Sequence, residues 1–108
     1  MALPPAAPPL PPSPAALQGV RVIEMGQLIA GPFCGKTLGE FGADVIKIEA
    51  PETGDPLRNW RLIKEGTSVW WQVQSRNKRS VALDLRQKEG QAIARQLIAE
   101  ADVLIENF

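Results

Sequence analysis

Two short apolar runs separated by a helical pattern constrain the fold of this chain more than any other feature. Residues 21–25 and 44–49 are rich in Val and Ile, as short buried strands are. Between them, Pro32 suits the first turn of a helix and Gly42 suits its C-terminus. The side chains that recur there at helical spacing are Phe33, Thr37, Leu38 and Phe41. A strand, a helix and a strand within fewer than 30 residues indicate a parallel α/β unit.

The second half of the chain adds two more strands and another helix. Alternating apolar residues predict a strand over 81–85, and the spacing of Ile and Leu predicts an amphipathic helix over 87–100. A last strand is predicted over 102–106. Prolines and glycines make residues 50–62 a loop, and residues 68–74 are predicted to form a short helix. The predicted fold class is therefore α/β, half of a doubly wound parallel sheet with flanking helices.

Proline content divides the chain into a tail and a folded part. Residues 1–16 hold seven of the ten prolines and no charged side chain. Because proline fixes φ and removes a backbone donor, we expect residues 1–17 to be a disordered proline-rich tail. This tail lacks the basic start of a signal peptide, and a docking ligand for a partner protein is the alternative interpretation. Residues 18–108 are expected to fold.

The charge balance and the missing histidine exclude several classes of function. Twelve basic residues balance twelve acidic ones, so no net field would attract nucleic acid or a membrane. The chain has no His, which is the commonest general base and metal ligand. Cys34 is the only cysteine and gives neither a disulfide nor a zinc-ligand spacing. We therefore expect no metal, no nucleic-acid partner, no membrane span and a cytoplasmic location.

Residues 30–37, with the sequence AGPFCGKT, match a relaxed Walker A pattern. A phosphate-binding loop wraps its ligand with consecutive backbone N–H groups. Pro32 has no N–H to donate, and Phe33 is bulky where the backbone must approach the anion. The favoured interpretation is a helix whose N-terminal amides face a ligand. A P-loop nucleotide hydrolase stays as an alternative from another class of function.

Two polar stretches are candidates for ligand contact. Arg76, Lys78, Arg79 and Arg86 place four cations within eleven residues, a density typical of phosphate binding or of a solvated turn. Residues 54–60, with the sequence GDPLRNW, are predicted to form a turn that carries a surface ion pair.

Three sequence blocks follow one another in a fixed order: AGPFCGKTLGEFGADVIKIEAPETGDPLRNW, SRNKRSVALDL and KEGQAIARQLIAEADVLIENF. This order resembles the N-terminal part of the family III CoA-transferases, the formyl-CoA transferase-like or CaiB/BaiF-like enzymes. The resemblance implies that residues 18–108 are the N-terminal portion of a Rossmann-like CoA-binding domain. It also implies an interlocked homodimer and a catalytic aspartate that lies beyond Phe108.

The resemblance also implies which residues contact coenzyme A. Carried over position by position, they are Ile29, Ala30, Leu83, Arg86, Asn107 and Phe108. Ile29 and Ala30 would face the thioester end of the ligand. Leu83 and Arg86 would contact its nucleotide end, and Asn107 and Phe108 would line the cofactor cleft. Two positions depart from formyl-CoA transferase: Ile29 replaces a glutamine, and Ala50 replaces an arginine. Arg86 and the basic residues 76–79 would have to compensate for that arginine.

The implied activity is transfer of CoA between an acyl-CoA thioester and a free carboxylic acid through a covalent aspartyl intermediate. No catalytic residue is assigned within the 108 residues, so we expect this chain to be inactive by itself. An α-methylacyl-CoA racemase of the same superfamily is the nearest alternative, although the long segment 54–76 favours the transferase. A non-catalytic CoA-binding module is a third possibility.

Overall fold

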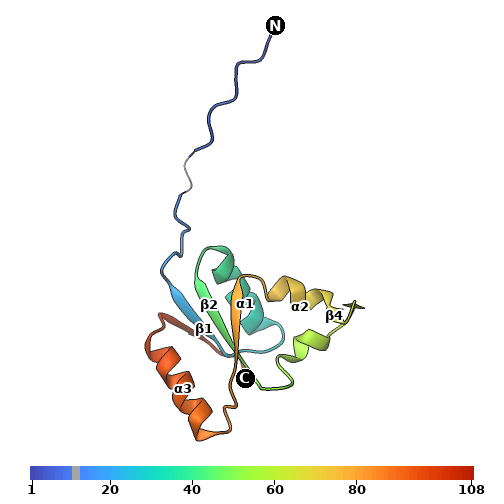
Figure 1. Cartoon of the computed structure of the whole chain (residues 1–108), viewed down its shortest axis with the longest axis vertical. Coiled ribbons are helices and arrows are strands. Elements are labelled where there is room, and N and C mark those ends of the chain that lie inside the picture. The colour runs from blue at the N-terminus through green and yellow to red at the C-terminus, as the bar shows by residue number, and fades with distance from the viewer. Residues whose placement is uncertain (11–12) are drawn as a thin grey trace.

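A four-stranded parallel sheet forms the centre of the molecule, in the strand order β5-β2-β1-β6 (Figure 1). The structure is a computed structural model, and it describes residues 1–10 and 13–108. The strands are β1 (Arg21–Glu24), β2 (Asp44–Glu49), β5 (Lys78–Ala82) and β6 (Val103–Ile105). Val22 of β1 is in register with Val45 of β2 and with Val103 of β6. The predicted parallel α/β fold is confirmed.

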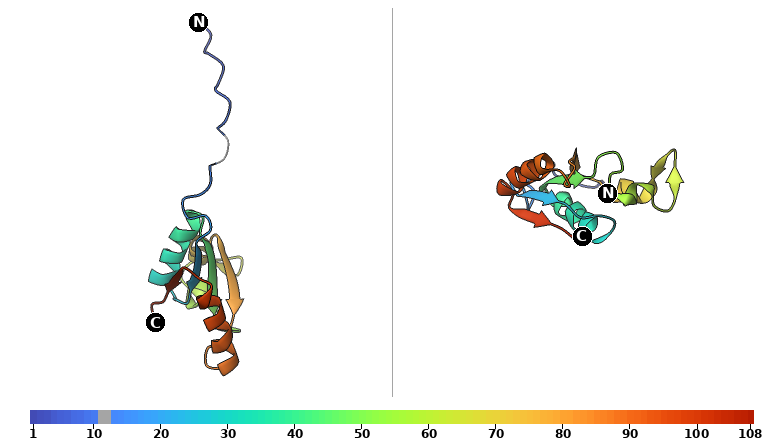
Figure 2. Two further views of the ribbon diagram at one scale, coloured as in Figure 1. Left: turned by 90° about the vertical axis from the view of Figure 1, so that its left-hand side faces the viewer. Right: turned by 90° about the horizontal axis from the view of Figure 1, so that it is seen from below.

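Two helices cover opposite faces of this sheet (Figure 2). On one face, α1 (Ala30–Glu40) lies over a cluster that includes Val22 and Val45. On the other face, α3 (Lys88–Ala99) packs its Ala94 against Ile23. The central strands β1 and β2 are therefore largely buried, as expected where helices connect parallel strands, whereas β5 and β6 are partly exposed.

The strand predicted over 81–85 is displaced toward the N-terminus. β5 ends at Ala82, which is opposite Glu49, the last residue of β2. Leu83 and Leu85 continue the alternation beyond the ladder and pack into the same core cluster as Ala94. The pattern of apolar residues identified the face that meets α3, whereas the polar residues that begin β5 gave no strand signal.

The connection from β2 to β5 forms a small unit beside the sheet (Figure 1). It consists of a 3₁₀ turn η1 (Pro56–Asn59), a two-stranded antiparallel hairpin of β3 (Ile63–Lys64) and β4 (Thr67–Ser68), and helix α2 (Val69–Gln74). The predicted short helix over 68–74 is confirmed as α2. The predicted loop over 50–62 contains the 3₁₀ turn, which begins where Asp55 accepts a hydrogen bond from the N–H of Leu57.

Helix α1 meets the sheet through glycines rather than through the phenylalanines of the predicted apolar face. Phe33 and Phe41 are 53% and 57% exposed. The buried residues of the helix are Gly31, Pro32, Gly35 and Gly39. A Cβ on Gly35 would lie 2.2 Å from Glu24 Oε2, so only glycine lets the helix backbone approach this strand.

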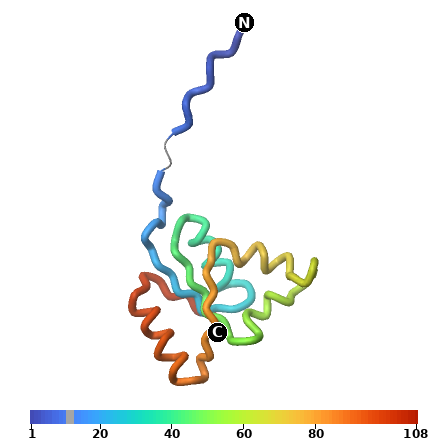
Figure 3. Tube along the Cα trace, viewed as in Figure 1, coloured from blue at the N-terminus to red at the C-terminus, as the bar shows by residue number. Residues whose placement is uncertain are grey.

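The tail leads away from the sheet in Figure 3, and residues 1–10 are exposed without regular secondary structure. Pro11 and Pro12, part of the predicted tail, lie outside the described residues. The N–H of Leu17 donates to the carbonyl of Phe41, and this contact anchors the start of the folded part. None of the helices in the described part of the chain has the length and apolar character that a bilayer span requires.

We predict that Gly35→Ala destabilises the fold by about 3 kcal/mol, because the added methyl group displaces a buried, ion-paired carboxylate. Urea unfolding followed by tryptophan fluorescence would measure this change. Cys34→Ala is the matched control, since Cys34 is the preceding residue of the same helix and is exposed. Equal stability of the two variants would contradict the close packing of α1.

Candidate functional site

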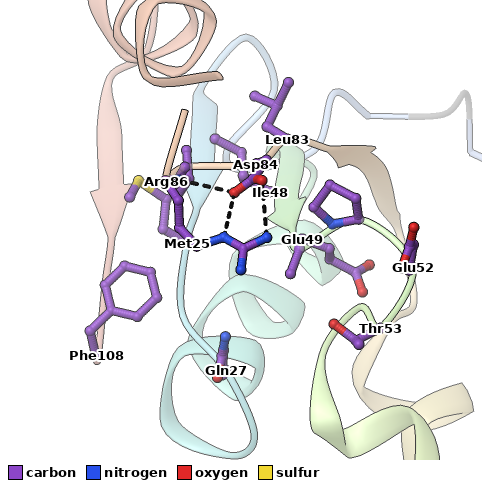
Figure 4. Close-up of a pocket in the computed structure, with 13 residues that line it drawn as sticks. Met25, Gln27, Ile48, Glu49, Glu52, Thr53, Leu83, Asp84, Arg86 and Phe108 are labelled. Carbon is purple, nitrogen blue, oxygen red and sulfur yellow. Dashed lines mark hydrogen bonds and ion pairs between the residues drawn. The ribbon is translucent and has the colours of Figure 1, made fainter. Parts of the chain in front are cut away.

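A pocket of about 630 Å³ opens at the carboxyl edge of the sheet (Figure 4). Every strand of the sheet contributes to it from its carboxyl end. The lining residues that follow or end the strands are Met25 and Gln27 after β1, Ile48 to Thr53 at β2, Leu83 to Arg86 after β5, and Phe108 after β6. Parallel α/β sheets bind ligands at this edge, so the pocket is the candidate site.

The pocket lining combines apolar side chains with hydrogen-bonding groups. The apolar side chains of the lining are Met25, Ile48, Pro51, Leu83, Leu85 and Phe108. Gln27, Thr53, Asp84 and Arg86 supply polar groups. An apolar surface with a few directed polar groups is the usual composition of a small-molecule site.

Arg86 is held at the pocket mouth by Asp84. Its Nε donates to Asp84 Oδ1 at 2.9 Å, and its Nη2 donates to Oδ2 at 3.0 Å (Figure 4). The hydrogen bonds from Arg86 lower the pKa of Asp84, and the same bonds raise the pKa of Arg86. The Arg86 side chain is nevertheless 87% exposed, so its remaining N–H groups face solvent and can meet an anion.

Glu49 lines the pocket, but its carboxylate is fully engaged. Burial would raise the pKa of Glu49, but hydrogen bonds from Arg58, from the N–H of Asp55 and from Ser80 lower it to about 2. The guanidinium of Arg58 lies 4.1 Å from the ring centre of Trp71 and so links Glu49 to α2. A carboxylate held in this way stays ionised and is a poor proton-transfer base.

A buried network of charged side chains lies under the site. Glu24 pairs with Lys47 at 2.8 Å and with Lys78 at 2.7 Å, and Lys47 also pairs with Asp55 at 2.9 Å. These side chains are at most 3% exposed. Burial lowers the pKa of Lys78, and the hydrogen bond with Glu24 opposes that shift.

Sequence reasoning missed this network. The signal was present, because Glu24 and Lys47 interrupt the two apolar runs at positions that face the same side of adjacent strands. The prediction of a surface ion pair within residues 54–60 is wrong. Asp55 is 2% exposed, and Arg58 pairs with a buried carboxylate.

Three of the six residues that the resemblance assigned to CoA line the pocket: Leu83, Arg86 and Phe108. Ile29 lies at the N-terminal end of α1 and is 45% exposed, and Ala30 begins the helix. Asn107 bonds the backbone of Gln27 instead of lining the pocket. Their contact with CoA stays a prediction.

The basic residues 76–79 lie at the opposite edge of the sheet, because Lys78 begins β5. Arg76 pairs with Glu40, Lys78 with Glu24, and Arg79 with Asp44. The expectation that these cations compensate for Ala50 is therefore wrong, since they are remote from the pocket and already paired.

The Walker-like residues 30–37 all lie in α1, within an ordinary helix rather than a loop. Gly35 faces the sheet, and Lys36 lies over the ring of Phe33 with its Nζ 4.7 Å from the ring centre. The carbonyl of Pro32 accepts a hydrogen bond from Lys78. This geometry contradicts a phosphate-binding loop.

The hydrogen bonds to the Glu49 carboxylate predict that the free energy of unfolding decreases at low pH. Because its pKa falls from 4.5 to about 2 on folding, its contribution is present above pH 4.5 and is lost as the pH falls through about 2. Glu49→Gln should cost roughly 3 kcal/mol at pH 7 and remove this part of the acid dependence. Urea unfolding at several pH values, followed by tryptophan fluorescence, measures both effects. The exposed Glu52→Gln is the control, and an unchanged acid limb in Glu49→Gln would contradict the assignment.

The comparisons with known proteins agree with this geometry. Residues 17–108 match the family described as CoA-transferase family III. The succinyl-CoA–D-citramalate CoA-transferase of Chloroflexus aurantiacus is 50% identical over 96 residues, which are 88% of this chain and 24% of that protein. The formyl-CoA:oxalate CoA-transferase of Escherichia coli is 42% identical over 93 residues, which are 85% and 22% of the two chains.

A solved structure shows the same arrangement. The CAIB/BAIF family protein from Brucella suis is 44% identical to the chain and superposes with a TM-score of 0.80, covering 89% of this chain and 26% of that one. The chain thus spans about a quarter of the length of the curated relatives it matches. Because the match extends over the whole folded part, the chain belongs to CoA-transferase family III.

Proposed function

We propose that the protein to which these residues belong transfers coenzyme A from an acyl-CoA thioester to a free carboxylic acid. The observation that carries this proposal is the pocket at the carboxyl edge of the sheet, which is lined by apolar side chains and by Arg86, in a chain of CoA-transferase family III. The named relatives that support it are transferases acting on succinyl-CoA, succinate or formyl-CoA.

The pocket suits the nucleotide part of CoA. Leu83 and Phe108 offer apolar surface to a nucleobase, and Arg86 offers charged donors to a phosphate. In this arrangement Ile29 and Ala30, at the start of α1, lie toward the thioester end. The adjacent N-terminus of an 11-residue helix adds favourable electrostatics for an anionic group.

The proposed chemistry is covalent. An aspartate carboxylate attacks the acyl carbon of the thioester, the C–S bond breaks, and a mixed anhydride and CoA thiolate form. The thiolate then attacks the aspartyl carbonyl, which releases the donor acid and leaves an aspartyl-CoA thioester. The acceptor carboxylate attacks the carbonyl carbon of this thioester, which forms a second anhydride and releases CoA thiolate. The thiolate then attacks the acyl carbon that comes from the acceptor. The new acyl-CoA forms and the aspartate returns.

The aspartates of this chain are unsuited to that nucleophilic role. Asp44 and Asp102 lie at the amino edge of the sheet. Asp55 is buried against Lys47, and Asp84 is bound by Arg86. We therefore place the nucleophile outside these residues.

The alternatives have less support. The relatives named above are transferases, so the comparisons do not favour the α-methylacyl-CoA racemase. The helical conformation of residues 30–37 contradicts the P-loop hydrolase. A CoA-binding module without catalysis is the remaining competitor. The cytoplasmic location and the interlocked homodimer stay predictions.

We predict that the full-length protein exchanges CoA between succinyl-CoA and a dicarboxylic acid without ATP and in excess EDTA. The relatives motivate D-citramalate, malate and glutarate as acceptors. Mass spectrometry of the acyl-CoA products measures the exchange, and succinyl-CoA without acceptor is the control. Loss of turnover on chelation, or binding of CoA without exchange for any acceptor, would contradict the transferase. Deuterium entering the carbon next to the thioester without exchange would favour the racemase.

We predict that Arg86→Ala weakens CoA binding about tenfold and dephospho-CoA or pantetheine binding less, because a charge-assisted phosphate contact is lost. Asp84 shares the guanidinium and Arg86 is exposed, so the effect should shrink at high salt. Calorimetric titration of the full-length protein gives the comparison. The control is Arg95→Ala on the exposed side of α3. Equal losses for all three ligands would mean that Arg86 acts through packing rather than through a phosphate.

A further inference from the structure

The backbone of the loop between β1 and α1 is fixed by side chains from three other elements. We propose that Lys47, Asp55 and Asn107 are positioning residues that hold the backbone of Gly26–Leu28, so that the side chain of Gln27 extends from a fixed backbone position and offers its amide to a ligand in the pocket. The ligand part of this inference rests on the proposed function.

Asn107, which follows β6, forms two side-chain hydrogen bonds to the backbone of Gln27. Its Oδ1 accepts from the N–H of Gln27 at 2.8 Å, and its Nδ2 donates to the carbonyl of Gln27 at 3.1 Å. The preceding backbone contact, in which the N–H of Met25 donates to the carbonyl of Ile105, lies directly after the end of β1 at Glu24. Asn107 therefore links the two chain segments beyond Met25 and Ile105 through its side-chain amide.

Lys47 and Asp55 form hydrogen bonds to the backbone of the residues on either side of Gln27. Lys47 donates to the carbonyl of Gly26 at 2.7 Å, and Asp55 Oδ1 accepts from the N–H of Leu28 at 3.0 Å. Both side chains are at most 2% exposed and pair with each other at 2.9 Å. Because these side chains are buried and paired, they cannot move out into solvent. They therefore fix the position of the loop relative to the sheet.

The loop needs this support. Leu28 has φ of +62°, in the left-handed region that is unfavourable for a residue with a Cβ. The backbone is also crowded, since a Cβ on Gly26 would lie 2.2 Å from Asn107 Oδ1. Such a conformation persists where surrounding contacts determine it, and these sites commonly present a ligand group in a fixed place.

Gln27 is the residue that this arrangement presents. It is exposed and is one of the residues that line the pocket (Figure 4). Within residues 1–10 and 13–108, its side-chain amide forms no hydrogen bond, so both its donor and its acceptor are available to a ligand. An amide or carbonyl group of an acyl-CoA is a suitable partner.

The test is a double-mutant cycle in the full-length protein, with hydrogen exchange and transfer kinetics as readouts. Asn107→Ala should speed exchange of the Gln27 amide about 5-fold and leave core amides unchanged. It should lower kcat/KM for CoA transfer about tenfold. Gln27→Ala should lower kcat/KM equally, and the double variant should lose no more than Gln27→Ala alone.

The matched control is Asp102→Ala. Asp102 Oδ2 accepts from the N–H of Arg21 at 2.9 Å, so it joins the same two strands at the opposite edge. This control should leave kcat/KM unchanged. Asn107→Asp keeps the acceptor for the Gln27 N–H, so exchange there should lie nearer to the wild type. This variant replaces Asn107→Ala if that protein fails to fold.

Several outcomes would overturn the inference. Additive losses in kcat/KM would show that Asn107 contacts the ligand itself, and unchanged exchange at Gln27 would show that it does not hold the loop. An equal kinetic loss in Asp102→Ala would reduce the effect to general stability. If the wild type transfers no CoA, the proposed function fails, whereas the exchange comparison still decides whether Asn107 holds the loop.

Discussion

The buried ion pairs among Glu24, Lys47, Asp55 and Lys78 are the interaction on which the rest of the structure depends. Burying four charges is costly, and such pairs stabilise little compared with apolar residues of similar volume. Removing one partner is more costly still, typically about 3–5 kcal/mol, because an unpaired charge then stays in the interior. The network therefore acts mainly by specifying geometry: two acids and two bases are satisfied together only if their elements keep one arrangement.

That arrangement joins the parts of the chain that build the pocket. Lys78 reaches the carbonyl of Pro32 and so fixes the start of α1, which glycines bring close to the sheet. Asp55 accepts from the N–H groups of both Leu28 and Leu57, and this ties the β1–α1 loop to the unit beside the sheet. The same unit supplies Arg58, which neutralises Glu49 at the edge of the pocket. A change in the network would thus move several walls of the pocket together.

The sequence predicts the parallel sheet and the helices well. Runs of Val and Ile indicate the buried strands, and the spacing of Leu and Ile in α3 indicates the face of the helix that packs on the sheet. The sequence predicts the buried face of α1 only in part: Leu38 packs against the core, but Phe33 and Phe41 are exposed, and the glycines that set the closest helix–sheet approach carry no hydrophobic signal. The resemblance placed Leu83, Arg86 and Phe108 at the carboxyl edge. The sequence did not predict the contacts that hold the backbone around Gln27, because Lys47, Asp55 and Asn107 are distant from one another in the chain. Charged residues are expected to face solvent unless their burial is known.

The charges of the pocket lining limit how it can attract an anionic ligand. Glu49, Glu52 and Asp84 are acidic, and Arg86 is the basic residue among the described lining residues. Arg58 neutralises the charge of Glu49, and Arg86 is shared with Asp84, so the lining has no excess of positive charge and a phosphate would be held through the few remaining N–H donors of Arg86. Binding at this edge then depends on apolar contact and on the direction of a few donors rather than on net charge. Under that condition a small displacement of a donor is costly, and a rigidly held loop has a direct advantage over a mobile one.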